Sequence, residues 1–271
     1  MLTLVPTPIG NIEDITLRAI KALESADLFL CEDTRVARKL IKLLQDRLSI
    51  TVKSSKYLSF HEYNQESFLS KLEPSFFKQN IVYISDAGMP CISDPGAKLV
   101  EYCIKNEIEY DVLPGPSAAI TAFAASGFEG RFTFFGFLPY KGKDRKKRLE
   151  EVLDSPYFSI VFEAPHRLLK FLNEIENIDN DREIFLAKEL TKRYQRFFKG
   201  TVGEILDLIK NVDIKGEWVA IISPKKESFS QGALTKQDIL SLNISKKEKA
   251  KLLSKITSKS VKECYEELIR G

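Results

Sequence analysis

Glu32, Asp33 and Arg35 are the first side chains in the sequence whose types and spacing could do chemistry, because they directly follow an apolar run. Carboxylates at the end of a buried strand could accept a proton or bind a ribose hydroxyl. Asp33 and Arg35 could equally form an ion pair that caps the next helix, and the sequence leaves both roles open. Lys188 is a further candidate base if burial lowers its pKa.

Three loops contain more glycine, proline and small polar residues than a simple connection needs, namely residues 6–11, 85–96 and 113–118. Each follows an apolar run, and ligands of open α/β sheets bind beyond the carboxyl ends of the strands. In the longest loop, Gly88 allows backbone conformations that other residues avoid, so this loop could cradle a cofactor. Ser117 is a natural N-cap, and the amides after it suit an anion. The first and third loops could also be simple tight connections.

The sequence lacks the motifs of several common enzyme classes. It contains neither G-x-G-x-x-G nor G-x-x-x-x-G-K-[ST], and no nucleophile elbow, which argues against Rossmann, P-loop and serine-hydrolase chemistry. Its four cysteines form no C-x-x-C pair and only two histidines are present, so no metal site is expected. No apolar run approaches about 18 residues, and the short apolar start does not resemble a signal peptide. We therefore expect a cytoplasmic protein without a membrane segment.

Positive charge is concentrated in two regions, although the net charge of the whole chain is only +3. Residues 225–271 have a net charge of +5, so the preceding 224 residues have a net charge of −2. Within residues 141–148, six cations surround the single acid Asp144, which is typical of a surface that binds phosphate backbones. A solvated helix face is the alternative for both regions. The candidate RNA-binding side chains of the second region are Lys141, Lys143, Arg145, Lys146, Lys147 and Arg148.

The elements that must position these residues are predicted from apolar runs that alternate with helical patterns. Buried strands separated by helices imply parallel α/β packing. The alternation is interrupted at Pro114–Pro116 and then begins again. We therefore predict an N-terminal α/β domain over residues 1–114 and a C-terminal α/β domain over residues 115–224.

The composition changes after Pro224, where Ser, Lys and Gln predict a linker that extends to Gly232. S-x-x-E capping boxes then begin at Ser245 and Ser260. The apolar residues that follow the second box recur at helical spacing and are expected to form a packing surface. Residues 225–271 are therefore predicted to be a linker followed by a small basic helical module.

Together, these motifs resemble those of one known family. Its opening motifs correspond to Pro6–Asn11, Glu13–Ala19, Glu32–Arg35 and Phe60–Asn64. The remaining motifs follow in the family's order at Ser85–Gly96, Leu113–Ala118, Phe162–Arg167, Glu189–Lys192 and Lys215–Glu217. From about Leu2 to Ile222, the chain resembles the ribosomal RNA small subunit methyltransferase I family, whose members are 2′-O-ribose methyltransferases of the tetrapyrrole methylase superfamily.

This resemblance implies two α/β domains of the tetrapyrrole methylase type with S-adenosyl-L-methionine in the cleft between them, and usually a homodimer. It also implies 2′-O-methylation of a cytidine in the decoding region of 16S ribosomal RNA, with the small ribosomal subunit as the expected partner. The family usually has Thr and Gly where this chain has Met89 and Cys91, and cysteine lacks the backbone freedom of glycine. Carried over by position, the cofactor contacts are Pro8, Asp86, Ala87, Gly88, Ile92, Ser93, Ser117, Ala118, Phe162 and Leu186.

The expected reaction is an in-line displacement at a sulfonium methyl group, in which alignment supplies much of the rate. Glu32 or Asp33 is expected to accept the hydroxyl proton while Arg35 holds the RNA, and Lys188 is the alternative base. Two other functions would use the same fold: methylation of a small tetrapyrrole precursor, and non-catalytic RNA binding by a ribosome-assembly factor. The basic regions argue against the first alternative and the intact cofactor loops argue against the second.

Overall fold

The N-terminal half of the chain forms a five-stranded parallel sheet in the order β3-β2-β4-β1-β5. The computed structural model describes the backbone of residues 1–225, 235–257 and 259–270. Three strands are buried along their whole length, as expected where helices cover both faces of a parallel sheet. The strands are β1 (Leu2–Leu4), β2 (Leu28–Cys31), β3 (Tyr57–Ser59), β4 (Ile81–Ile84) and β5 (Tyr110–Val112).

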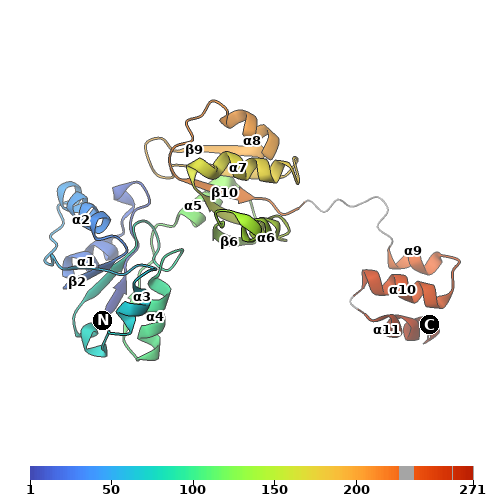
Figure 1. The fold of residues 1–271 in the computed structure, drawn as a ribbon, viewed down its shortest axis with the longest axis horizontal. Coiled ribbons are helices and arrows are strands. Elements are labelled where there is room, and N and C mark those ends of the chain that lie inside the picture. The colour runs from blue at the N-terminus through green and yellow to red at the C-terminus, as the bar shows by residue number, and fades with distance from the viewer. Residues whose placement is uncertain (226–234, 258, 271) are drawn as a thin grey trace. The chain divides into compact units, whose positions relative to one another are not determined.

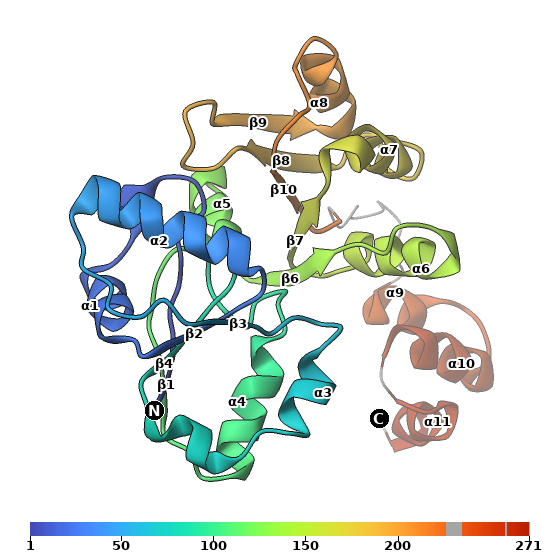
Figure 2. The ribbon, with the colours of Figure 1, turned by 60° about the vertical axis from the view of Figure 1, so that its left-hand side comes forward.

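Helices lie on both sides of this sheet, as Figures 1 and 2 show. On one side, α1 and α2 pack over a core that includes Leu23, Phe29 and Ile41. On the other side, α4 packs over a core that includes Tyr83 and Leu99. The helical segments of this half are η1 (Ile12–Asp14), α1 (Leu17–Ser25), α2 (Thr34–Leu48), α3 (Gln65–Leu69), η2 (Pro74–Lys78) and α4 (Gly96–Lys105).

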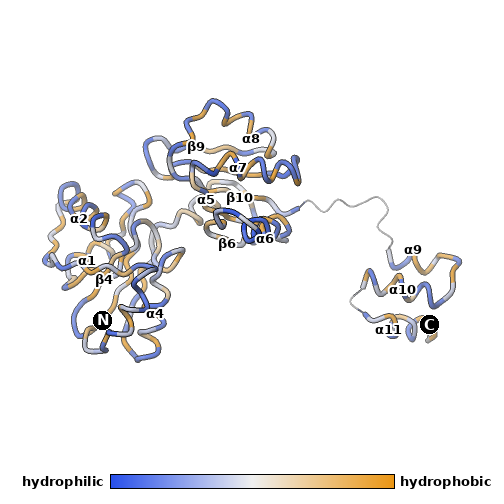
Figure 3. Tube along the Cα trace, in the orientation of Figure 1, coloured by the Kyte–Doolittle hydropathy of each residue, from blue (hydrophilic) through white to orange (hydrophobic). Residues whose placement is uncertain are grey.

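The second half of the same compact unit is built on a separate five-stranded sheet in the order β6-β7-β10-β8-β9. Helices α6, α7 and α8 pack on one face, and α5 covers the other. Figure 3 shows that α6 is largely hydrophilic along its length. The strands are β6 (Phe132–Phe137), β7 (Phe158–Glu163), β8 (Glu183–Lys188), β9 (Arg196–Thr201) and β10 (Trp218–Ile222). The helices are α5 (Ala118–Ser126), α6 (Gly142–Leu153), α7 (Pro165–Glu176) and α8 (Val202–Ile209).

The expectation of parallel packing is confirmed for the first sheet but is wrong for most of the second. In this sheet, as far as the structure describes the chain, β6 and β7 alone pair in parallel, whereas β10 is antiparallel to both β7 and β8, and β8 is antiparallel to β9. The cause is the short connection 189–195 between β8 and β9, because a parallel crossover needs about a dozen residues or more. This hairpin reverses the direction of the chain, so β10 then enters the sheet against its neighbours.

Residues 226–271 belong to a separate unit, in which three helices surround a core of Ile239, Ala250, Leu253 and Cys264. The predicted capping boxes are confirmed, because Ser245 and Ser260 each exchange hydrogen bonds with the Glu three residues later. Only part of the predicted packing surface is covered, since Ile269 is 57% exposed. The predicted linker from residue 226 to Gly232 lies outside the described residues. The helices are α9 (Lys236–Ser241), α10 (Lys246–Ile256) and α11 (Val261–Arg270).

Among the residues that the structure describes, no helix is long and apolar enough to cross a membrane. The described residues also contain no cluster of His, Cys, Asp or Glu that could hold a metal ion.

Candidate functional site

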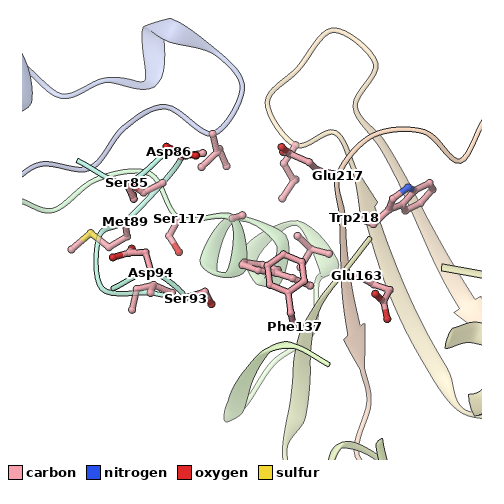
Figure 4. Close-up of a pocket in the computed structure, with 18 of the residues that line it drawn as sticks. Ser85, Asp86, Met89, Ser93, Asp94, Ser117, Phe137, Glu163, Glu217 and Trp218 are labelled. Atoms are coloured by element: carbon pink, nitrogen blue, oxygen red, sulfur yellow. The ribbon is translucent and has the colours of Figure 1, made fainter. Parts of the chain in front are cut away.

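A pocket of about 550 Å³ lies between the loops of the first sheet and one end of the second (Figure 4). The loop after β4 and the start of α5 form one wall, and the ends of β6, β7 and β10 form the other. Both sheets therefore contribute to one pocket. Eight of the ten side chains predicted to contact the cofactor line it, namely Asp86, Ala87, Gly88, Ile92, Ser93, Ser117, Ala118 and Phe162.

The loop after β4 is held in place by the loop after β1. The backbone amide of Thr7 donates to the Gly88 carbonyl at 3.0 Å, and the Gly88 amide donates to the Thr7 carbonyl at 3.1 Å. Gly88 has φ +82°, a left-handed conformation that glycine adopts easily. Cys91 and Ser93 also have positive φ, at +69° and +72°. Cys91 therefore occupies the left-handed region without glycine's freedom, and such residues are often found at functional sites.

Three carboxylates face the pocket from the first sheet. Burial raises the pKa of Glu32, and the negative charges of Asp86 and Asp94 raise it further. Burial also raises the pKa of Asp86, although its Oδ1 accepts a hydrogen bond from the Asp33 amide at 3.2 Å. Asp94 Oδ1 accepts bonds from the Tyr83 hydroxyl and the Gly96 amide, whereas its buried Oδ2 has no protein partner among the described residues. The wall is therefore negatively charged and retains unused acceptor capacity.

Asp33 and Arg35 form the helix cap that the sequence left as one alternative. Asp33 Oδ1 accepts from the Arg35 amide at 2.8 Å, and Oδ2 accepts from Arg35 Nη2 at 2.6 Å. Arg35 bonded to this carboxylate lowers the pKa of Asp33 to about 2. Neither side chain lines the pocket. Of the two candidate acids, Glu32 is therefore the one placed at the pocket with a raised pKa.

Lys188, Leu186 and Pro8 are not among the residues that line the pocket. The Leu186 side chain belongs to the core beneath α7 and α8, on the face of β8 opposite to Ala187. Lys188 lies on the same face of β8 as Leu186, and its Nζ donates to the carbonyl of Asp213. The structure therefore does not support Lys188 as the base.

The prediction that Arg145 binds RNA is wrong, because this side chain is 3% exposed. Its guanidinium lies 3.3 Å from Glu163 and 2.8 Å from Glu174. Arg167 approaches the other oxygen of Glu163 at 2.7 Å. Arg145 therefore fastens α6 to β7 and α7. The other five cations of this region are exposed, namely Lys141, Lys143, Lys146, Lys147 and Arg148.

Sequence reasoning missed much of the second wall. Phe137, Trp218 and Val219 line the pocket, as does Glu217 of the predicted Lys215–Glu217 motif. The sequence did not indicate that Phe137 faces the pocket, apart from its position next to the basic region, because the orientation of its side chain depends on the pairing of β6 with β7.

A hydrogen bond between the two halves joins the loop after β1 to the turn after β8. The Asn11 amide donates to the Thr191 hydroxyl at 2.9 Å. A Cβ on Gly10 would lie 2.5 Å from Lys192 Cγ, 2.5 Å from Thr191 Oγ1 and 2.6 Å from the Leu190 carbonyl. Leu190 itself lines the pocket. The absence of a side chain at Gly10 thus allows the close approach of the two halves beside the pocket.

Comparisons with known proteins agree with this architecture. Residues 1–206 match the sequence model of the "Tetrapyrrole (Corrin/Porphyrin) Methylases". Proteins named "Ribosomal RNA small subunit methyltransferase I" are similar over nearly the whole chain. The Helicobacter pylori (strain J99) protein is 41% identical over 98% of this chain and 96% of its own length, and the Campylobacter fetus protein is 40% identical over 99% and 100%.

Solved structures of low sequence identity share the fold. A cobalt precorrin-4 methyltransferase superimposes with a TM-score of 0.59 at 16% identity, covering 82% of this chain and 94% of its own. A uroporphyrin III C-methyl transferase from Thermus thermophilus gives 0.55 at 16% identity, covering 82% and 96%.

Proposed function

Because the chain belongs to the tetrapyrrole (corrin/porphyrin) methylase family, we propose that its pocket binds S-adenosyl-L-methionine and that the protein methylates small-subunit ribosomal RNA. The substrate follows from the relatives that match almost end to end and are named as ribosomal RNA methyltransferases. The finer proposal is that the acceptor is the ribose 2′-hydroxyl of a cytidine in the decoding region of 16S ribosomal RNA. We further propose that the protein acts as a homodimer on small ribosomal subunits, in the cytoplasm.

The residues of the pocket suit this cofactor. Its volume of about 550 Å³ is in the range of small-molecule sites, which is roughly 300–1,000 Å³. The cofactor carries a sulfonium and an ammonium, and Asp86 and Asp94 give the wall of the pocket the opposite charge. The unpartnered Oδ2 of Asp94 is available to accept a hydrogen bond from a ligand. The amides at the start of α5, after Ser117, suit a carboxylate.

The chemistry of the proposed reaction requires alignment and removal of one proton. S-adenosyl-L-methionine supplies an electrophilic methyl group. We assign Glu32 as the acceptor of the hydroxyl proton, because its raised pKa makes it a stronger base than an ordinary exposed carboxylate. The low pKa of Asp33 makes it a weak base, so its role is to cap α2. The pairing of Thr7 with Gly88 holds the loop that positions both reactants.

The exposed face of α6 is the proposed RNA surface. Lys143, Lys146, Lys147 and Arg148 are exposed on a helix whose N-terminal end follows directly from the strand that bears Phe137. A small tetrapyrrole needs no such extended cationic surface, which favours RNA over the alternative substrate. The solved methyltransferases of low identity share the fold with this chain and say nothing about its substrate.

The decisive test is transfer of a labelled methyl group to small ribosomal subunits purified from cells that lack this protein. We expect one equivalent of 2′-O-methylcytidine in 16S ribosomal RNA on nucleoside analysis. Glu32→Gln, with unchanged cofactor affinity, serves as the inactive control. If the protein binds S-adenosyl-L-methionine but labels no RNA, the proposed substrate is wrong.

A further inference from the structure

Strand β6, which leads to α6, contains a β-bulge beside the pocket. Along the β6–β7 pair, Phe134 lies opposite Ile160, but the next paired residue is Gly136, opposite Val161. One residue of β6 is therefore inserted without a partner. Gly136 has φ +66°, a left-handed conformation that glycine adopts easily and that would be strained for other residues. Bulges of this kind re-aim the side chains that follow them.

The direct result of the bulge is the orientation of Phe137. In an uninterrupted strand, Phe135 and residue 137 would point to the same face, because side chains alternate with a period of two. Phe135 packs against the core beneath α6 and α7. With the bulge, Phe137 lies opposite Phe162 and lines the pocket instead. The bulge thus moves one aromatic ring from the core face to the pocket face.

The ring of Phe137 is supported on one side and open on the other. It makes an edge-to-face contact with Phe162, with ring centroids 5.5 Å apart. It nevertheless remains 58% exposed, in contrast to most aromatic side chains of this half of the chain. Four residues later, the segment of exposed cations begins at Lys141. An exposed aromatic ring that precedes a run of exposed cations in the chain is a platform on which a nucleobase can stack.

We propose that Phe137 stacks against the base of the target nucleotide, or of its immediate neighbour, and so positions the ribose at the mouth of the pocket. This inference rests on the proposed function, since it assigns a further residue to the same reaction. A nucleotide that leaves its helical stack to bring its ribose into a pocket loses base contacts, and stacking on an aromatic side chain compensates for them. Phe137 is a positioning residue in this proposal and takes no part in proton transfer.

The test compares Phe137→Leu with Phe137→Tyr in the full-length protein. Leucine keeps an apolar side chain and removes the aromatic face, whereas tyrosine keeps the face. The matched control is Phe197→Leu, because Phe197 is also partly exposed, at 45%, on β9 and away from the pocket. We would measure kcat and KM for small ribosomal subunits, and the Kd of S-adenosyl-L-methionine by calorimetry. Thermal unfolding of each variant would show whether it is folded.

We expect Phe137→Leu to lower kcat/KM for the subunits by about 5- to 150-fold, which corresponds to the ~1–3 kcal/mol typical of one base–aromatic stack. The Kd of the cofactor should change by less than about two-fold, and Phe137→Tyr and Phe197→Leu should remain near wild type. An equal loss of cofactor affinity would mean that the ring stacks on the cofactor's own adenine, and would overturn the proposal. Wild-type kcat/KM in Phe137→Leu would also overturn it. If the wild-type protein labels no RNA, the proposed function fails together with this assignment.

Discussion

Arg145 provides a test of whether burial or net positive charge determines the role of a cation on α6. The perturbation is Arg145→Met, which keeps most of the side-chain volume and removes the charge. Arg145 is 3% exposed and Glu163 is fully buried, so the variant leaves a buried carboxylate with fewer partners. Removing one member of a buried ion pair typically costs about 3–5 kcal/mol. Arg167 stays beside Glu163 at 2.7 Å, so we expect the lower end, ~3 kcal/mol.

The matched control is Lys146→Met, one residue further along the same helix. Lys146 is 81% exposed and lies 3.9 Å from Glu150, so its loss should cost less than about 0.5 kcal/mol. Urea unfolding followed by circular dichroism measures both values. The salt dependence of RNA binding should change in Lys146→Met and remain unchanged in Arg145→Met. The reasoning is refuted if Arg145→Met unfolds like the wild type and instead weakens RNA binding.

Three further perturbations address the pocket and the RNA surface. Glu32→Gln should lower kcat by roughly 10²- to 10⁴-fold without changing cofactor affinity, and the wild-type kcat should fall as pH decreases through the raised pKa of Glu32. Gly10→Ala should weaken cofactor binding, because its Cβ would meet the Leu190 carbonyl at 2.6 Å and force the two halves apart. The double variant Lys143→Met/Lys147→Met should reduce the slope of log K against log salt by about two. Isothermal calorimetry, single-turnover assays and filter binding measure these effects.

Normal turnover in the Glu32→Gln variant would exclude Glu32 as the base. Thr191→Val removes the hydroxyl that accepts from Asn11 without adding bulk, so it should weaken cofactor binding less than Gly10→Ala, and the reverse order would contradict the steric argument. An unchanged salt slope in the double variant would place the RNA elsewhere on the protein.

Ionised Glu32 is expected to promote the reaction but to lower the stability of the folded protein. A carboxyl group whose pKa is raised by folding favours the folded state while protonated, and this contribution is lost as pH rises through the folded pKa. At pH 7 the ionised carboxylate therefore disfavours folding. Glu32→Gln should unfold at a higher temperature than the wild type at pH 7, and the difference should disappear toward pH 4. A lower melting temperature at pH 7 would contradict a raised pKa of Glu32.

The first sheet was largely predictable because three of its strands, β1, β2 and β4, are short apolar runs that are buried along their whole length. The loops at their carboxyl ends were predictable for the same reason, and eight of the ten predicted cofactor side chains line the pocket. The antiparallel part of the second sheet was not predicted. Strand β9 is exposed at the sheet edge and has no buried apolar run, so periodicity alone could not identify it.

The positions of Arg145, Leu186 and Lys188 follow from the periodicity of their own helix or strand. Arg145, Leu149 and Val152 are all buried on α6, at spacings of four and three residues, so Arg145 lies on the apolar stripe of its helix. Along β8, Leu186 and Lys188 share the face opposite to Ala187, as a period of two requires. The orientation of Phe137 could not be obtained this way, because a bulge shifts the alternation by one residue.

The chain passes from the first sheet to the second only once, between β5 and β6, and this crossing contains two residues of the pocket wall, Ser117 and Ala118. The pocket therefore lies beside the segment that would act as a hinge if the two halves rotated relative to one another. When two bodies rotate about a hinge, points near the hinge move little and distant points move farther. A small rotation of the halves would leave the contacts beside the crossing almost unchanged and open the outer rim widely. In such a rotation, a small molecule bound beside the crossing would be displaced less than a large molecule bound at the rim.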